Sequence, residues 1–260
     1  MHGLGLFMAF MRNSVQSEIE YRANTLVNLI NSALMVILLI AILNAFFFRV
    51  ETLGGWSLDQ MLALFGVALI LEGLIDCWLY PSLHRLSESV RRGDLDLVLV
   101  RPVDSQFAMS FSNLHIWKAP NIFIGFGIVL YSMNQLGTLS PINVAQFLLM
   151  LTCGIAIFYS IFLATCTLAF WLTMIEDVWI ITYSLMEVGR FPVTAYPGWM
   201  RIVMTYVVPI AFISNVPAEA AAGLLTIDRQ IAGFVVAALA LGLSRWFWRY
   251  SLARYSSASS

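Results

Sequence analysis

Two carboxylates inside an apolar stretch are the side chains whose placement most suggests chemistry. Glu72 and Asp76 stand four residues apart, so a helix would carry both on one face. An ionised carboxylate in hydrocarbon costs at least about 2.5 kcal/mol, so such residues usually face a bundle interior or a wet cavity. The two residues therefore indicate a polar pathway lining or an interhelical hydrogen bond. The alternative, a carboxylate hydrated at the membrane surface, fits Asp76 better because Asp76 is nearer the cytosolic end.

A second charged pair stands just before a region rich in proline. Glu187 and Arg190 are three residues apart and are the only charged residues between positions 178 and 200. One helical turn separates them, so they could form an ion pair. With the helix breaks at Pro192 and Pro197, they could act as a gate near the outer mouth of a pathway. The alternative is an arginine that reaches the outer lipid headgroups beside a hydrated glutamate.

Motifs for catalysis and nucleotide binding are missing from the sequence. The only lysine, Lys118, follows a tryptophan rather than a glycine, so the chain has no Walker A phosphate loop. The three histidines show no metal-ligand spacing, and the three cysteines lie in apolar stretches. The sequence therefore predicts no catalytic, cofactor-binding or metal-binding residue.

The composition requires a membrane. Of 260 residues, 60% are hydrophobic and only 11% are charged, whereas soluble domains carry about 25% charged residues. A water-soluble fold could not cover this much apolar surface. The net charge of −1 offers no basic surface for nucleic acid.

Six apolar segments are predicted to cross the bilayer, giving an all-α integral membrane fold. A helix needs about 20 residues to cross a hydrocarbon core of about 30 Å. The predicted spans lie at about 23–48, 60–80, 111–133, 144–174, 178–188 and 227–250, of which the fifth is short. Turns are expected at Gly54-Gly55 and at 134–141, and Pro81 is expected to end the second span.

Three segments outside these spans have distinct patterns. Residues 1–22 have one apolar and one polar face, which is typical of a helix in the membrane interface; the alternative is a frayed cytosolic tail.

Residues 82–106 combine a short helix ended by Gly93 with apolar residues beside charges, which indicates a docking surface for another protein. Asp104 can cap the next helix. In 191–226 prolines leave pieces too short to cross separately, so this region must be buried, line a cavity or lie at the interface.

The basic residues predict that both chain ends are cytosolic. With six spans, the fourteen lysines and arginines gather on the inner side except for Arg49, Arg190, Arg201 and Arg229. Arg245 and Arg249, at the end of the last span, can reach the headgroups.

Two runs of the sequence carry a family resemblance. Residues 91–102, Arg-Arg-Gly-Asp-Leu-Asp-Leu-Val-Leu-Val-Arg-Pro, resemble the cytosolic loop of bacterial ABC exporter permeases of the ABC type 2 superfamily. The match is to a branch with a Gly-acidic-Leu-Asp…Arg-Pro loop. Residues 190–209 are similar to the proline-rich element of that superfamily after the fifth span. The resemblance covers nearly the whole chain.

The resemblance implies one permease domain, 1–260, in the bacterial inner membrane. It implies an elbow helix at 1–22, six spans, a coupling helix within 82–106 and a re-entrant outer hairpin at 191–226. It further implies pairing with the same or a sister permease and binding of two copies of a separate ATPase that holds the ATP. The residues implied to couple to the ATPase are Gly93, Asp94, Leu95, Asp96, Arg101 and Pro102.

Two other classes of function stay open at this point. An intramembrane enzyme acting on lipids could use Glu72, Asp76 and the arginines of the 82–106 segment, but it would need polar groups that converge at one depth. A passive channel or assembly factor is the third possibility. A weakly charged apolar bundle suits an amphipathic or lipid-like cargo better than a small ion.

Overall fold

The structure is a bundle of helices. It is a computed structural model that describes residues 22–92, 96, 100, 103–115, 119–171 and 178–254, and all regular structure among these residues is helical. The α-helices are α2 (Arg22–Phe47), α3 (Leu58–Leu74), α4 (Tyr80–Arg92), α6 (Ser105–Ser110), α7 (Pro120–Gln135), α8 (Pro141–Thr167), α9 (Val178–Gly189), α10 (Gly198–Ile202), α11 (Val216–Ala221) and α12 (Ile227–Leu252). The π-helical and 3-10 segments are η2 (Ile75–Leu79), η4 (Leu168–Phe170), η5 (Val193–Ala195), η6 (Val203–Val207) and η7 (Ala211–Asn215).

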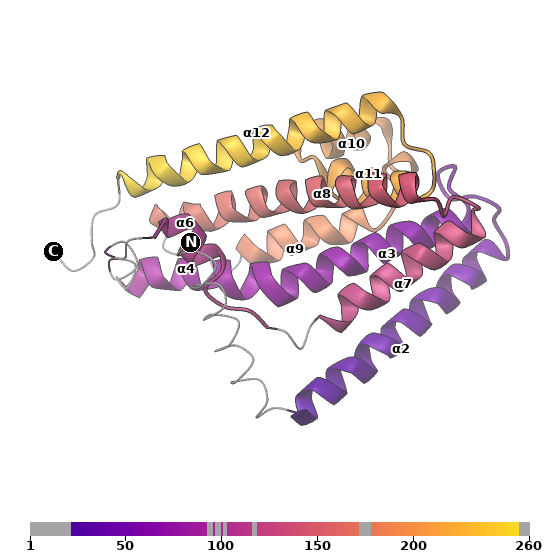
Figure 1. The fold of residues 1–260 in the computed structure, drawn as a ribbon, viewed down its shortest axis with the longest axis horizontal. Helices are drawn as coiled ribbons and strands as arrows, with labels where there is room; N and C mark the ends of the chain where they lie inside the picture. The colour runs from indigo at the N-terminus through magenta and orange to yellow at the C-terminus, as the bar shows by residue number, and fades with distance from the viewer. Residues whose placement is uncertain are drawn as a thin grey trace.

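The described part of the chain contains four helices that are long and apolar enough to cross a membrane. They are Ile30–Phe47, Leu58–Leu86, Pro141–Phe170 and Ile227–Leu252. A bent pair, Gly198–Val207 and Ala211–Ala221, could add a fifth crossing or a re-entrant loop, and its two arms meet at 77°. In Figure 1 the long helices run in similar directions, and α2 and α12 lie at opposite edges of the bundle. The predicted all-helical, multi-pass membrane fold is thereby confirmed in outline.

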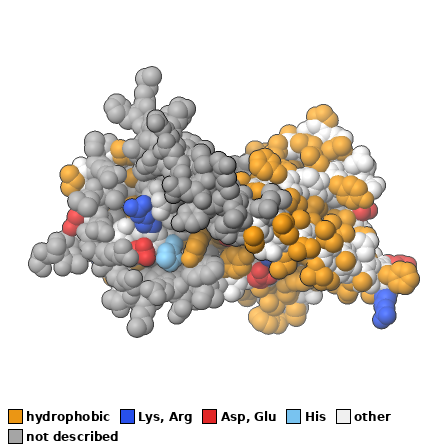
Figure 2. All heavy atoms as spheres, turned by 90° about the horizontal axis from the view of Figure 1, so that it is seen from below, with side chains coloured by type: hydrophobic (Ala, Val, Ile, Leu, Met, Phe, Trp, Pro, Cys, Tyr) orange, Lys and Arg blue, Asp and Glu red, His pale blue; other side chains and the backbone are white. Residues whose placement is uncertain are grey.

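The outer surface of the bundle suits lipid. Hydrophobic side chains cover most of the described part of the face in Figure 2, where charged side chains are few. On α2, the large side chains Leu34, Met35 and Ile37 are all exposed. Exposed apolar side chains on successive turns are expected where hydrocarbon replaces water as the solvent.

Glycines bring α3 and α7 close together. A Cβ atom at Gly125 would lie 2.7 Å from the carbonyl oxygen of Gly66, and one at Gly66 would lie 2.7 Å from Cγ2 of Val129. A Cβ atom at Gly73 would lie 2.7 Å from Cγ1 of Ile122. Small residues allow this approach in membranes, where helix association depends on close packing. These contacts hold α3 against its neighbour and so fix the position of Glu72.

The expectation that Pro81 ends the second span is wrong. The helix passes through η2 into α4, so that Leu58–Leu86 forms one long helix. Proline cannot donate to the carbonyl four residues earlier, which here belongs to Cys77. That carbonyl accepts instead from the backbone N–H of His115 at 2.7 Å. Because the freed carbonyl has a partner from another segment, the helix can continue.

The expected start of the third span at 111 is also wrong, since α7 begins at Pro120. The chain before it lies along η2 and α4: the Trp78 indole N–H donates to the Ser110 carbonyl at 2.7 Å, and the Ser82 hydroxyl donates to the Asn113 carbonyl. Asp104 caps a helix as predicted, by accepting from Phe107 N at 3.1 Å. That helix is α6, which ends at 110 and lies apart from α7.

The proline-rich region is broken as predicted, and its backbone is satisfied from inside the protein. The Tyr196 hydroxyl donates to the Val188 carbonyl at 3.0 Å, and the Ser214 hydroxyl donates to the Gly189 carbonyl at 2.7 Å. Asn215 Oδ1 accepts from Val193 N at 2.8 Å. These bonds meet the requirement that irregular backbone at membrane depth be buried in protein. The interfacial helix expected at 1–22 falls on residues that lie outside the described part, except Arg22.

We predict that Gly125→Leu weakens the bundle while Gly127→Leu does not. The side chain at 125 would collide with the α3 backbone, whereas a Cβ at Gly127 meets nothing within 4 Å. Overpacking of this kind costs about 1–3 kcal/mol, which should lower the melting temperature of the purified protein by at least about 3 °C. Equal melting temperatures for the two variants would contradict the close α3–α7 contact.

Candidate functional site

A charged cavity lies between α2, α3, α9 and the start of α7. Its volume is about 600 Å³. The α2 side of the lining is mainly apolar, with Met35, Leu38 and Ile42 among its residues. The ionisable side chains in the lining are Glu72, Asp76, Tyr183, Glu187 and Arg190. The sequence predicted Glu72, Glu187 and Arg190 as pathway or gate residues, and the structure brings these three to one cavity together with Asp76, for which hydration at the membrane surface was the favoured interpretation.

Arg190 is the central charge of this cavity. Its Nε donates to Glu72 Oε1 at 2.8 Å, and its Nη2 also contacts that oxygen. The same Nη2 lies 3.1 Å from Glu187 Oε1. The predicted pairing of Glu187 with Arg190 is therefore present, and Glu72, from a helix 118 residues earlier, is a second partner that helical spacing could not indicate.

The two carboxylates differ in their exposure to solvent. The Glu72 side chain is 13% exposed and the Glu187 side chain 49%. Removal of one partner from a buried pair costs about 3–5 kcal/mol, because the other charge is left without compensation. The hydrogen bond to Glu72 therefore restrains Arg190 more strongly than the contact with Glu187 does. The Glu187 carboxylate is the partner that water can replace.

The depth of this ion pair distinguishes it from a surface salt bridge. Glu72 is the middle residue of the apolar helix Leu58–Leu86, with roughly 20 Å of helix on each side. Arg190 directly follows α9, whose 12 residues rise about 18 Å. A cation is favoured at the negative end of a helix dipole. Arg190 turns toward Glu72, so the alternative of an arginine anchored at the outer headgroups does not describe this structure.

The other residues proposed from the sequence lie elsewhere. Pro192 is buried before η5, and Pro197 is exposed before α10; neither is among the residues that line the cavity. Of the coupling residues, Gly93, Asp94, Leu95, Arg101 and Pro102 are outside the described part of the chain. Asp96 is described and half-buried.

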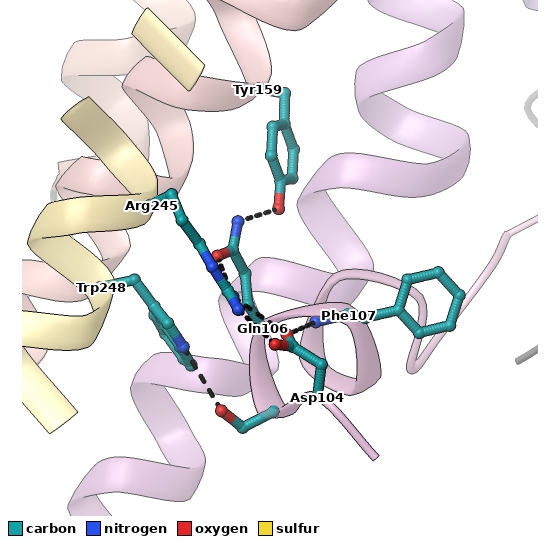
Figure 3. A network of polar contacts seen from close by, with 7 residues as sticks. Asp104, Gln106, Phe107, Tyr159, Arg245 and Trp248 are labelled. Atoms are coloured by element: carbon teal, nitrogen blue, oxygen red, sulfur yellow. Dashed lines mark hydrogen bonds and ion pairs between the residues drawn. The ribbon is translucent and has the colours of Figure 1, made fainter. Parts of the chain in front are cut away.

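A second polar cluster joins α6 to α8 and α12, and we call Asp104, Gln106, Tyr159 and Arg245 the clamp (Figure 3). Arg245 Nη1 donates to Asp104 Oδ1 at 3.0 Å and to Gln106 Oε1 at 2.7 Å. Gln106 Nε2 donates to the Tyr159 hydroxyl at 3.0 Å. The hydrogen bond from Arg245 lowers the pKa of Asp104, although burial opposes this shift. Arg245 is thus bonded to α6 within the protein, while its side chain remains 36% exposed.

The clamp begins two residues after the predicted coupling segment ends at Pro102. Trp248 Nε1 donates to the Ser105 hydroxyl at 3.4 Å, which adds a second tie between α6 and α12 (Figure 3). The sequence offered one signal for this arrangement, the capping position of Asp104. Its pairing with Arg245, 141 residues later, could not be predicted from the sequence, because it depends on how α6 and α12 pack.

Sequence reasoning also missed an ion pair between Glu219 and Arg229. Glu219 lies in α11, where every residue is buried, and it contacts the Arg229 guanidinium. Its Oε2 is buried and has no hydrogen-bond partner among the described residues. A signal was available, because Glu219 is the only charged residue between positions 202 and 227. The pair fastens α11 to the start of α12.

Comparison with known proteins gives a family for the chain. A family model described as ABC-2 family transporter protein matches residues 32–259. The matched part contains every residue of the charged cavity except Asn31, and the whole clamp. No curated protein matches the sequence.

We predict that Arg190→Gln and Glu72→Gln are not additive. Each single change leaves a charge unpaired at membrane depth and should cost about 3–5 kcal/mol, whereas the double variant removes both charges. Melting temperatures of the purified variants should therefore show that the double variant is no less stable than either single one.

Arg201→Gln is the matched control, because Arg201 is exposed and donates to the Thr194 carbonyl at 2.9 Å. It should melt close to the unchanged protein. If the effects of Glu72→Gln and Arg190→Gln are small and simply add, the buried pair does not constrain the bundle.

Proposed function

The chain belongs to the ABC-2 family of transporter proteins as a membrane-embedded permease subunit, and from this premise we propose that it exports its cargo with energy from ATP hydrolysis by a separate ATPase. The observation that carries the proposal is the ion pair between Arg190 and Glu72 in a cavity that has further ionisable side chains and a mainly apolar wall on the α2 side. Buried charges that pair within a membrane bundle usually mark a pathway or a moving contact.

The arrangement around Arg190 supports a gate with two states. Arg190 and Glu187 are three residues apart at the end of α9, whereas Glu72 belongs to α3. If α9 moves away from α3, Arg190 keeps Glu187 as a partner and loses Glu72. The guanidinium is then never without a carboxylate, which lowers the cost of opening. The carboxylate of Glu72 becomes accessible in the open state, where cargo or water can replace the arginine.

We propose that the 93–102 segment docks on the ATPase and that the clamp transmits its movement. The clamp fixes the chain just after this segment to both α8 and α12. A displacement of the docked segment would therefore move two long helices and not a free loop. The predicted docking residues Gly93, Asp94, Leu95, Asp96, Arg101 and Pro102 belong to this proposal.

The proposed assembly is two permeases with two ATPase copies in the bacterial inner membrane. Six crossings with both termini cytosolic fit the arginine distribution. The apolar wall that α2 gives to the cavity, with Leu38 and Ile42 exposed, leaves room for a second permease, of the same sequence or a sister chain, to close the pathway.

We predict that the purified chain hydrolyses no ATP alone and that a partner ATPase is stimulated by it. Leu95→Asp or Arg101→Glu should abolish both stimulation and transport, since a mismatched charge in a docking surface costs several kcal/mol. Membrane insertion, measured by the yield of folded protein, should be unchanged. Normal transport by both variants would refute the coupling role of the 93–102 segment.

We also predict that the clamp variant Arg245→Gln uncouples the two activities. The ATPase should still bind, because the docking segment is intact, but ATP hydrolysis should no longer produce transport. Arg254→Gln is the control: this arginine lies on the ring of Tyr250, 4.1 Å from its centroid, near the same end of α12. Equal transport per ATP in the two variants would exclude the clamp from coupling.

A further inference from the structure

A second hollow lies at the α12 edge of the bundle, away from the charged cavity. Its volume is about 520 Å³, and its walls come from α8, η6 and α12. Small-molecule sites typically measure roughly 300–1,000 Å³. Among its lining residues are Ala164, Tyr206, Leu239, Leu243 and Trp246. We call this hollow the lateral groove.

The lateral groove offers hydrocarbon contacts in place of hydrogen bonds. Three small hydroxyl residues line it, and each donates to a carbonyl of its own helix: Ser160 to Ala156 at 2.7 Å, Thr205 to Arg201 at 2.7 Å and Ser244 to Leu241 at 3.1 Å. The Tyr206 hydroxyl and the Trp246 indole N–H are the other polar groups of the lining, and both side chains are exposed at its rim; along the rest of the groove a polar molecule would lose its bonds to water without replacement. The chemistry of the walls therefore selects an apolar chain.

The lateral groove opens sideways to the lipid phase. Leu239 is 60% exposed and Leu243 is 64% exposed, although both lie within the apolar helix Ile227–Leu252. At one end the groove meets Pro209, at the break between the two arms that are bent by 77°. An acyl chain can enter from the side and is stopped by this bend.

The other end of the lateral groove carries groups that suit a lipid headgroup. Trp246 lines it there, and tryptophan prefers the interface between hydrocarbon and water. Arg249 follows one helical turn after Trp246, outside the groove lining, and is exposed. Arg245 is ion-paired with Asp104 in the clamp. Arg249 is therefore the exposed cation of this turn that a lipid headgroup could contact. A phosphate at this level would complement its charge.

We propose that the lateral groove binds one acyl chain of an anionic phospholipid, with the headgroup at Arg249. The proposed orientation places Arg249 on the cytosolic side, so the lipid comes from the inner leaflet. The site is separate from the charged cavity and is not part of the cargo pathway. Because the lipid would touch α8, α12 and η6 together, its binding holds the bent hairpin against the last helix.

Photolabelling of the purified chain in nanodiscs tests this site. The discs contain phosphatidylcholine with a minor fraction of phosphatidylglycerol that carries a diazirine in its acyl chain, and labelled peptides are identified by mass spectrometry. We expect residues 205–207 and 239–247 to be labelled severalfold more than the exposed α2 face around Leu34. Uniform labelling of lipid-facing helices would overturn the proposal.

A pair of adjacent substitutions separates the groove from the general surface of α12. Leu243→Trp fills the groove from an exposed position, so the fold should tolerate it, and labelling should fall severalfold. Gly242→Trp adds the same bulk where a Cβ meets nothing within 4 Å and outside the groove lining; its labelling should be unchanged. Equal losses in the two variants would contradict a built groove.

The headgroup is tested with a diazirine phosphatidylcholine in place of the phosphatidylglycerol. The unchanged protein should prefer the anionic probe severalfold, and Arg249→Gln should abolish this preference while Arg201→Gln keeps it. Equal labelling by both probes in the unchanged protein, or cross-links between two copies at these peptides, would also refute the site. Labelling requires no transport, so this failure would leave the proposed function untouched.

Discussion

The requirement that every backbone polar group find a partner without water governs this structure. It explains why the regular structure is helical and why the breaks at Pro81 and after α9 have hydrogen-bond partners from other segments. At Pro81 the freed carbonyl of Cys77 accepts from His115. At the end of α9 the carbonyls of Val188 and Gly189 accept from Tyr196 and Ser214. These breaks join distant parts of the chain, so satisfying the backbone also builds the tertiary fold.

The ion pairs follow the same logic for charges. Glu72 with Arg190 joins α3 to the end of α9, and Asp104 with Arg245 joins α6 to α12. Each links a helix end or cap to a helix far away in sequence. For the buried Glu72–Arg190 pair, desolvation offsets the attraction so that the net stability is small, but separation of the partners is costly; the Asp104–Arg245 pair is more exposed, 45% and 36%, and acts mainly by its geometry. Such contacts therefore specify which helices are neighbours, and they make a movement between two arrangements cooperative.

The residues of the charged cavity show what helical spacing can and cannot predict. Spacing placed Glu187 beside Arg190 and Glu72 on one face with Asp76, and all four line the cavity. Spacing could not show that Arg190 bonds to Glu72, because contacts between helices depend on how the helices pack. The α3–α7 packing that sets this position rests on Gly66 and Gly125, whose role is visible only when the facing backbone is known.

The sequence by itself determined that lipid surrounds most of the chain and that the fold is helical. It also determined the main apolar segments and the position of the proline-broken region. These follow from composition and from local rules of hydropathy and backbone geometry, which act within one segment. The tertiary structure decided that the helix runs on past Pro81, that α7 starts at Pro120, and which arginine meets which carboxylate. Those outcomes required partners from elsewhere in the chain, such as His115 for the Cys77 carbonyl. A local rule states that a buried polar group needs a partner, but only the packed helices supply it.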